Sequence, residues 1–236
     1  MLTVSLEILT ALARNPWFRG LPLAEQQALL ALGTVTRLHS GEMVFRQGDG
    51  VAGVLGGCFY GLISGTVKTS TLRPDGKEAI LVMLEPGNWF GEISLIDGSP
   101  RTHDATALSA VALLVITGPD FAALMQRPAF SRGMLALLAA RVRALYGLME
   151  DATLRSTTAR VASRLAMLAH GDASFSPQTQ ARVQVSQESL AMMLGLTRQT
   201  LSKALKELER AGAVVLGYRC IEISAGDALA RAVREG

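Results

Sequence analysis

The spacing of apolar residues changes three times along the 236 residues of the chain. Between residues 4 and 32 it is helical, with breaks at Asn15-Pro16 and Gly20, so short helices are predicted there. From residue 35 to 116, runs rich in β-branched and aromatic residues alternate with glycine turns, which indicates an antiparallel sandwich or roll. The predicted strands are 43–45, 58–63, 67–71, 79–84 and 112–116.

After residue 128, apolar residues recur at alternating intervals of three and four. This narrow stripe is typical of a seam between two parallel helices, with charged residues such as Arg141 lying off it. A helix that packs on its own β domain is the alternative. We predict a dimerisation helix over residues 131–156. The predicted seam consists of Leu135, Leu138, Val142, Leu145, Met149 and Ala152.

Residues 186–210 have the pattern of two short helices that cross at Gly195. The small Ala191 and the apolar Leu201 allow the close crossing that a helix-turn-helix requires. One face of the second helix presents donors for base edges and phosphates, and residues 214–223 predict a hairpin that would form a wing. An ordinary amphipathic hairpin with a solvated basic face is the alternative. The predicted DNA-binding residues are Thr197, which also suits the N-cap, Arg198, Gln199, Ser202, Lys203, Lys206 and Arg219.

Charge supports this prediction. Residues 155–236 contain eleven Lys and Arg against seven Asp and Glu, whereas residues 1–154 contain twelve against thirteen. A basic C-terminal third favours a polyanionic partner such as double-stranded DNA.

Composition argues against several other classes of protein. Hydrophobic residues make up 49 % and charged residues 18 %, which favours compact packing, and the length favours two domains. No apolar run is long enough to span a bilayer and no basic leader is present, so we expect a cytoplasmic protein without a membrane partner. Cys58 and Cys220 are far apart and the three histidines are scattered, so neither an enzyme nor a metal site is expected.

The segment FGEISLIDGSPRTHDATA, residues 90–107, places Glu92 nine positions before Arg101 across a turn. An exposed ion pair would be the ordinary reading of such a segment. The order of roll, seam helix and winged helix-turn-helix, however, resembles the cyclic AMP receptor protein/FNR superfamily of bacterial transcription regulators. Residues 90–107 resemble that superfamily's phosphate-binding cassette, and the resemblance covers nearly the whole chain.

The resemblance implies an α+β fold in three parts. Residues 1–130 would form an N-terminal antiparallel β-roll of the cyclic-nucleotide-binding jelly-roll type, residues 131–156 a long dimerisation helix, and residues 157–236 a C-terminal winged helix-turn-helix. In the cassette, Arg101 would hold the phosphodiester through its guanidinium fork and Glu92 would accept from the ribose 2′-hydroxyl. The implied ligand-binding residues are Gly91, Glu92, Ile93, Ser94, Ser99, Pro100, Arg101, Thr102, Leu145 and Tyr146.

The function implied is a DNA-binding transcription regulator whose operator affinity depends on a cyclic nucleotide. Cyclic AMP is expected first. Cyclic GMP and cyclic di-GMP stay open because Leu145-Tyr146 replaces a Thr-Ser pair of the cyclic AMP receptor, and His103-Asp104 replaces small or apolar residues. Gln199 stands where a glutamate is common, so the operator sequence is also open. The expected partners are an operator, a second copy of the chain and RNA polymerase, and neither haem nor an iron–sulfur cluster is expected. The alternatives are a regulatory protein that acts on a protein partner, or a family member with another effector or none.

Overall fold

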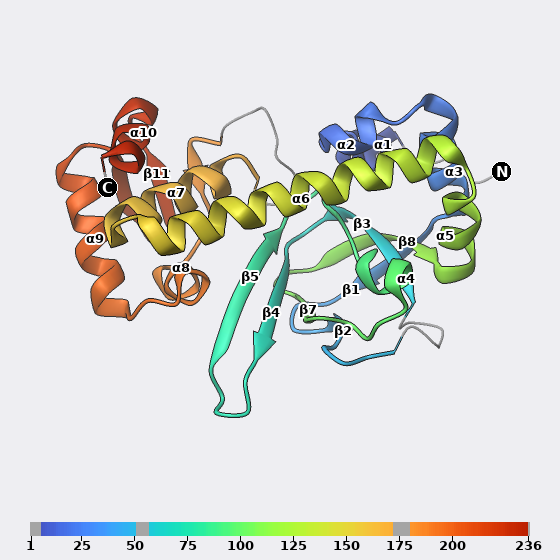
Figure 1. The fold of residues 1–236 in the computed structure, drawn as a ribbon, viewed down its shortest axis with the longest axis horizontal. Coiled ribbons are helices and arrows are strands. Elements are labelled where there is room, and N and C mark those ends of the chain that lie inside the picture. Colours follow the sequence, from blue (N-terminus) through green and yellow to red (C-terminus); the bar gives the residue numbers. More distant parts are fainter. Residues whose placement is uncertain (1–5, 51–56, 172–179, 236) are drawn as a thin grey trace.

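The computed structural model describes residues 6–50, 57–171 and 180–235. Figure 1 shows an N-terminal unit of strands and helices, a C-terminal unit rich in helices, and the long helix α6 (Pro128–Leu154) that crosses the molecule between them. The helices of the N-terminal unit are α1 (Leu6–Leu12), α2 (Pro16–Gly20), α3 (Leu23–Leu32), α4 (Ile93–Asp97) and α5 (Gly118–Met125). Its strands are β1 (Thr34–Leu38), β2 (Met43–Phe45), β3 (Cys58–Ser64), β4 (Val67–Leu72), β5 (Glu78–Leu84), β6 (Trp89–Phe90), β7 (Asp104–Ala107) and β8 (Val111–Thr117).

The strands form a roll of two antiparallel four-stranded sheets, with the orders β1-β8-β3-β6 and β2-β7-β4-β5. Side chains from both sheets, including Phe45 and Leu62, share one buried core. Turns between strands use glycine where φ is positive. At Gly65, for example, φ is 85° and an added Cβ would lie 2.3 Å from the Ala110 carbonyl oxygen, so no other residue fits that turn.

The first half of α6 is fixed to the N-terminal unit. Trp17 donates from Nε1 to the carbonyl of Gly133 at 2.7 Å. Arg127, at the start of α6, makes a bidentate ion pair with the buried Glu25 of α3, with N–O distances of 2.5 and 3.0 Å. These contacts hold the N-terminal turns of α6 against α2 and α3.

The C-terminal unit has its own core. Its elements are α7 (Thr157–Ala169), β9 (Arg182–Val183), α8 (Gln187–Leu194), α9 (Arg198–Arg210), β10 (Val214–Gly217), β11 (Cys220–Ile223) and α10 (Gly226–Arg234). Apolar faces of α7, α8 and α9 meet at Leu165, Leu190 and Leu205, which are fully buried. The strands form a small antiparallel sheet in the order β10-β11-β9.

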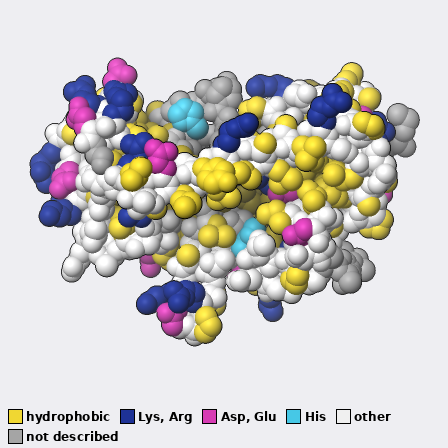
Figure 2. Space-filling model, viewed as in Figure 1, with side chains coloured by type: hydrophobic (Ala, Val, Ile, Leu, Met, Phe, Trp, Pro, Cys, Tyr) yellow, Lys and Arg dark blue, Asp and Glu magenta, His cyan; other side chains and the backbone are white. Residues whose placement is uncertain are grey.

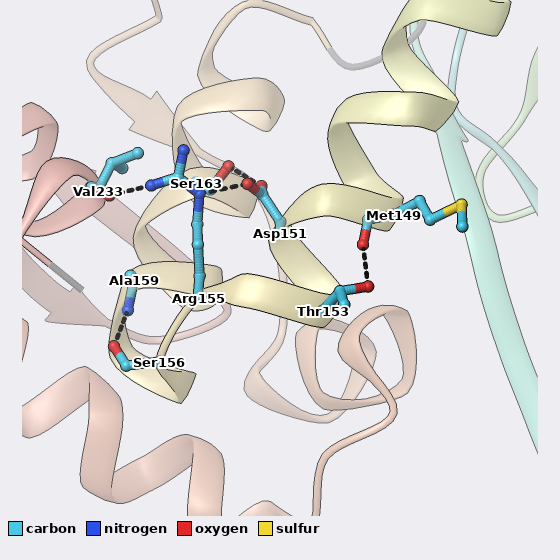
Figure 3. Close-up of polar contacts among 8 residues, drawn as sticks. All are labelled: Met149, Asp151, Thr153, Arg155, Ser156, Ala159, Ser163 and Val233. Carbon is cyan, nitrogen blue, oxygen red and sulfur yellow. Dashed lines mark hydrogen bonds and ion pairs between the residues drawn. The ribbon is translucent and has the colours of Figure 1, made fainter.

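Asp151 and Arg155 join α6 to the C-terminal unit, as Figure 3 shows. One carboxylate oxygen of Asp151 accepts from Arg155 Nε and the other accepts from the hydroxyl of Ser163 on α7. Arg155 also donates from Nη1 to the carbonyl of Val233, in the last turn of α10, where carbonyls lack a partner within the helix. We call these four residues the junction cluster. Through Asp151 and Arg155, the cluster connects the end of α6 to α7 and to α10.

Candidate functional site

The cassette begins at the end of β6 with Gly91, whose φ is 92°. A Cβ at this position would lie 2.8 Å from the carbonyl oxygen of Cys58, so the backbone can pass strand β3 only as glycine. This close passage turns the chain into α4. Glu92, at the N-cap position of α4, is fully buried.

Arg101 is also buried, with an exposed fraction of 3 %. It donates from Nη1 to the Gly91 carbonyl at 2.6 Å and from Nη2 to the Cys58 carbonyl at 2.9 Å. Its guanidinium carbon lies 4.3 Å from the centre of the Phe45 ring, a cation–π contact. Burial lowers the pKa of Arg101, although arginine stays charged in proteins. Nε of Arg101 is buried and has no hydrogen-bond partner among residues 6–50, 57–171 and 180–235.

Glu92 is paired with Arg141 of α6 rather than with Arg101, so the ordinary reading of an exposed Glu92–Arg101 pair is wrong. Oε1 of Glu92 accepts from Nη1 of Arg141, and Nη2 of Arg141 donates to the Trp89 carbonyl. Oε2 of Glu92 is buried, and no described residue forms a hydrogen bond with it. A buried carboxylate requires a partner charge, and the long helix supplies it.

Sequence reasoning missed Arg141 as a residue of this site. A signal was present, because Phe130, Met134, Leu137 and Arg141 recur at four, three and four positions and so share one face of α6. The first three are buried against the roll. Helix α6 therefore carries two stripes, and the alternative that it packs on its own β domain is correct for the first half of the helix.

The other predicted ligand residues surround this pair of charges or lie further along α6. Ser94 is buried, whereas Ile93, Ser99, Pro100 and Thr102 are exposed along the cassette. Leu145 and Tyr146, exposed by 64 % and 69 %, lie about one turn beyond Arg141.

Helix α9 presents the predicted DNA-reading face. Leu201, Ala204, Leu205 and Leu208 are buried on one side, which directs the opposite side outward. Thr197 accepts from the Thr200 amide at 3.2 Å and so caps the helix. A shallow hollow on the outer side is lined by Arg198, Gln199, Ser202, Lys203 and Lys206.

The wing is the hairpin β10–β11, with Gly217 paired to Cys220. Arg219 lies in its tip with φ of 53°, a left-handed conformation that is uncommon outside glycine. Tyr218 and Arg219 are both exposed. The hairpin thus holds a positive charge outside the body of the C-terminal unit.

Comparisons with known proteins match both units of the chain. Residues 35–128 match the Cyclic nucleotide-binding domain family and residues 159–232 the Crp-like helix-turn-helix domain family. The CRP-like cAMP-activated global transcriptional regulator of Mycobacterium tuberculosis is 31 % identical over 228 residues, which cover 94 % of this chain and 98 % of that protein. The chain belongs to the cyclic AMP receptor protein/FNR superfamily.

Two further proteins, one similar in sequence and one in structure, support this assignment. The Cyclic AMP receptor protein of Thermus thermophilus is 33 % identical, over 89 % of this chain and 92 % of that protein. The structure of FixK2 from Bradyrhizobium japonicum has the same fold, with a TM-score of 0.71 at 21 % identity over 84 % of this chain and 96 % of that one. The predicted fold class is confirmed, and the chain is a DNA-binding transcription regulator with a cyclic nucleotide-binding domain.

Regulators of this family form dimers, and α6 has a surface suited to that. Leu135, Val142, Leu145, Tyr146 and Met149 are exposed along its outer side, and Figure 2 shows hydrophobic side chains gathered where α6 crosses the molecule. Leu138 is half-buried and Ala152 is exposed. A contiguous exposed apolar surface of this kind indicates an interface.

Two further features concern the residues that the structure describes. None of their helices combines the length and the apolar character needed to cross a bilayer. Nor do their His, Cys, Asp and Glu side chains form a group of three or more that could hold a metal ion.

Proposed function

We propose that the β-roll binds a cyclic nucleotide, cyclic AMP before cyclic GMP or cyclic di-GMP, and that the bound nucleotide sets the affinity of the C-terminal unit for its operator. The observation that carries the proposal is a pair of buried polar atoms, Arg101 Nε and Glu92 Oε2, that have no hydrogen-bond partner among the residues that the structure describes. Buried polar atoms are nearly always hydrogen-bonded. A ligand with an anionic group and a hydroxyl would supply both partners.

A cyclic nucleotide has these two groups on neighbouring edges. Arg101 would donate to the phosphodiester, and Glu92 would accept from the ribose 2′-hydroxyl through Oε2 while Oε1 stays on Arg141. Ser99 and Thr102 would donate to the phosphate, and Ile93, Ser94 and Pro100 would shape its cradle. Gly91 lets the backbone approach it. Leu145 and Tyr146 would contact the base.

Cyclic AMP is placed first because both relatives described above carry it in their names, at 31 % and 33 % identity. For the same reason we propose that the chain acts in the cytoplasm as a homodimer that contacts RNA polymerase. The domain division follows the fold, with a sensor over residues 1–130, a dimerisation helix over 131–156 and a DNA-binding domain over 157–236.

On DNA, we propose that Thr197, Arg198, Gln199, Ser202, Lys203 and Lys206 lie in the major groove and that Arg219 lies on the backbone. A symmetric dimer would place two α9 helices in successive major grooves, about 34 Å apart. The effector would act by favouring that separation. A free energy of coupling between nucleotide and DNA of about 1–3 kcal/mol is typical of such linkage.

Calorimetric titration with cyclic AMP, cyclic GMP and cyclic di-GMP tests the proposal. Arg101→Ala should weaken binding by about 2–5 kcal/mol, since it removes a buried charged partner. If the alanine variant does not fold, Arg101→Lys replaces it in the test, because lysine keeps the positive charge but lacks the guanidinium fork. Arg73→Ala, on an exposed arginine of the β4–β5 hairpin, is the control and should bind normally.

Two results would contradict the proposal. If none of the three nucleotides binds, or if Arg101→Lys and Arg101→Ala both bind as tightly as wild type, the cassette is not a nucleotide site. If the bound nucleotide leaves operator affinity unchanged in gel-shift titrations, the two domains are not coupled.

A further inference from the structure

His103 occupies a position in the effector site that the roles above leave unexplained. It follows the cassette arginine by two residues and is partly buried. Its ring lies 5.8 Å from that of Phe45, the same ring that Arg101 covers. Its Nδ1 lies 2.8 Å from the hydroxyl of Thr102, a proposed phosphate ligand.

Four charged groups act on His103 from three elements. Arg101 and Asp104 come from its own segment, Glu92 from the start of α4, and Arg141 from α6. Burial and the two arginines lower the pKa of His103, and the two carboxylates oppose them with a smaller effect. The imidazole is therefore neutral at physiological pH before an anion arrives.

The hydrogen bond between His103 and Thr102 has two forms with different consequences. When the imidazole is neutral and Nδ1 carries no proton, the Thr102 hydroxyl donates to Nδ1 and its proton is not available to a ligand. When Nδ1 carries a proton, as it does in the other neutral tautomer and always in the imidazolium, Nδ1–H donates to the Thr102 oxygen and the hydroxyl proton is free to point elsewhere. Protonation to the imidazolium leaves only this second form, in which the Thr102 hydroxyl can donate to a neighbouring phosphate.

We propose that His103 makes effector binding proton-linked: the anionic phosphodiester binds together with one proton from solvent, which His103 takes up, and Thr102 then donates its hydroxyl proton to the phosphate. This inference rests on the proposed nucleotide site. It makes His103 a specificity residue for anionic ligands, because an uncharged ligand would not stabilise the imidazolium.

The sign of the pH dependence follows from linkage. A bound phosphodiester raises the pKa of His103 above its value in the free protein. The gain in affinity is full below the lower pKa of the free protein and is lost as pH rises through the higher pKa of the complex. A cyclic phosphodiester keeps one negative charge throughout this range. An opposite charge within about 4–6 Å shifts a pKa by about 1–3 units. Each unit by which the ligand raises the pKa of His103 is worth a factor of about ten in affinity. The affinity for cyclic AMP should therefore rise about tenfold from pH 8 to pH 6.

The test uses the full chain and cyclic AMP as the probe. Titration calorimetry at pH 6, 7 and 8 should show this rise for wild type and a nearly flat profile for His103→Gln, whose neutral amide can still bond to Thr102. His39→Gln removes an exposed histidine at the end of β1 and should retain the wild-type profile. At pH 7, titrations of wild type in MOPS and in Tris, two phosphate-free buffers that differ in ionisation enthalpy, should show net proton uptake on binding.

Each outcome separates the two proposals. Tight cyclic AMP binding with equal affinity at pH 6 and pH 8 and no proton uptake would overturn the role of His103 and leave the nucleotide site intact. A pH dependence that persists in His103→Gln would assign the proton to another group and also overturn it. If cyclic AMP, cyclic GMP and cyclic di-GMP all fail to bind at every pH, both proposals are overturned. The proton-uptake measurement needs no variant, so it stands even if His103→Gln does not fold.

Discussion

Replacing Arg141 by methionine tests whether the long helix neutralises a buried charge of the effector site. Methionine keeps the length and apolar stem of the side chain but removes its two hydrogen bonds, to Oε1 of Glu92 and to the carbonyl of Trp89. Glu92 is fully buried, and within the described part of the chain its Oε2 already lacks a partner. The variant would therefore leave an entire carboxylate without a partner in the interior.

Arg141→Met should lower the free energy of unfolding by a large fraction of the stability of a domain. Removing one partner of a buried ion pair costs about 3–5 kcal/mol, whereas domains are stable by about 5–15 kcal/mol. Glu92→Gln removes the charge and keeps an acceptor for Arg141, so it should cost about 1 kcal/mol. In the double variant neither member of the pair leaves the other as an unpaired buried charge. Its cost should therefore lie below that of Arg141→Met alone, so the coupling exceeds the cost of Glu92→Gln, about 1 kcal/mol.

Urea unfolding followed by tryptophan fluorescence measures these values in the right part of the molecule, since Trp17 and Trp89 both lie in the core of the N-terminal unit. Protein concentration is held constant because dimerisation also stabilises. Arg143→Met, at an exposed arginine of the same helix, should change stability by less than about 0.5 kcal/mol. A loss below about 1 kcal/mol for Arg141→Met, or strict additivity in the double variant, would refute the reasoning.

Three other predictions concern the seam, the DNA-reading face and the junction cluster. Leu145→Glu would place two charges in a symmetric interface, so sedimentation should show a monomer. The control is Leu72→Glu in β4, where the leucine is exposed by 59 % compared with 64 % for Leu145, and this variant should remain a dimer. If Leu145→Glu is also a dimer, α6 is not the interface. Arg198→Ala should lower discrimination between operator and random DNA in gel shifts by about 1–3 kcal/mol. Arg219→Ala, at the proposed backbone contact of the wing, should weaken binding to both DNAs about equally and reduce the salt slope. Identical effects of the two variants would contradict the assignment of base and phosphate contacts. Asp151→Asn should weaken the hydrogen bonds of residue 151 to Arg155 and Ser163, and so lower the ratio of operator affinities measured with and without cyclic AMP. The affinity for cyclic AMP, measured by calorimetry without DNA, should stay near that of wild type. An unchanged ratio would show that the junction cluster is not needed for coupling.

Periodicity predicted the elements whose burial is one-sided. Helix α9 is the best case, because its buried leucines and its basic face separate cleanly in the sequence, and the cap at Thr197 has a local signature. Strands β2 to β5 were also recognised within a residue or two at their ends, since glycine turns with positive φ separate them.

Other features depend on contacts that no local pattern encodes. The two-residue strands β6 and β9 exist only because a neighbouring strand pairs with them. Helix α4 has only five residues, too few for a period to show. The partner of Glu92 lies 49 positions away on a helix whose more regular stripe faces elsewhere, so the sequence indicated the acid and the arginine of the cassette but not the charge that balances the acid.

Helix α6 joins the effector site to the DNA-reading unit through two charged side chains. Arg141 ties it to Glu92, and Asp151, ten residues later, ties it to Arg155 and Ser163. At 1.5 Å per residue these attachments are about 15 Å apart, within a single uninterrupted helix. A nucleotide on Glu92 would act on the partner of Arg141, and the helix would carry a change in its position to the junction cluster. The free energy available, about 1–3 kcal/mol, is similar to that of one hydrogen bond to a charged group, about 1.5–3 kcal/mol. With an intact junction cluster, a change in the position of α6 can therefore move α7 and α10. In a cluster that has lost one hydrogen bond, α6 would move without moving these two helices.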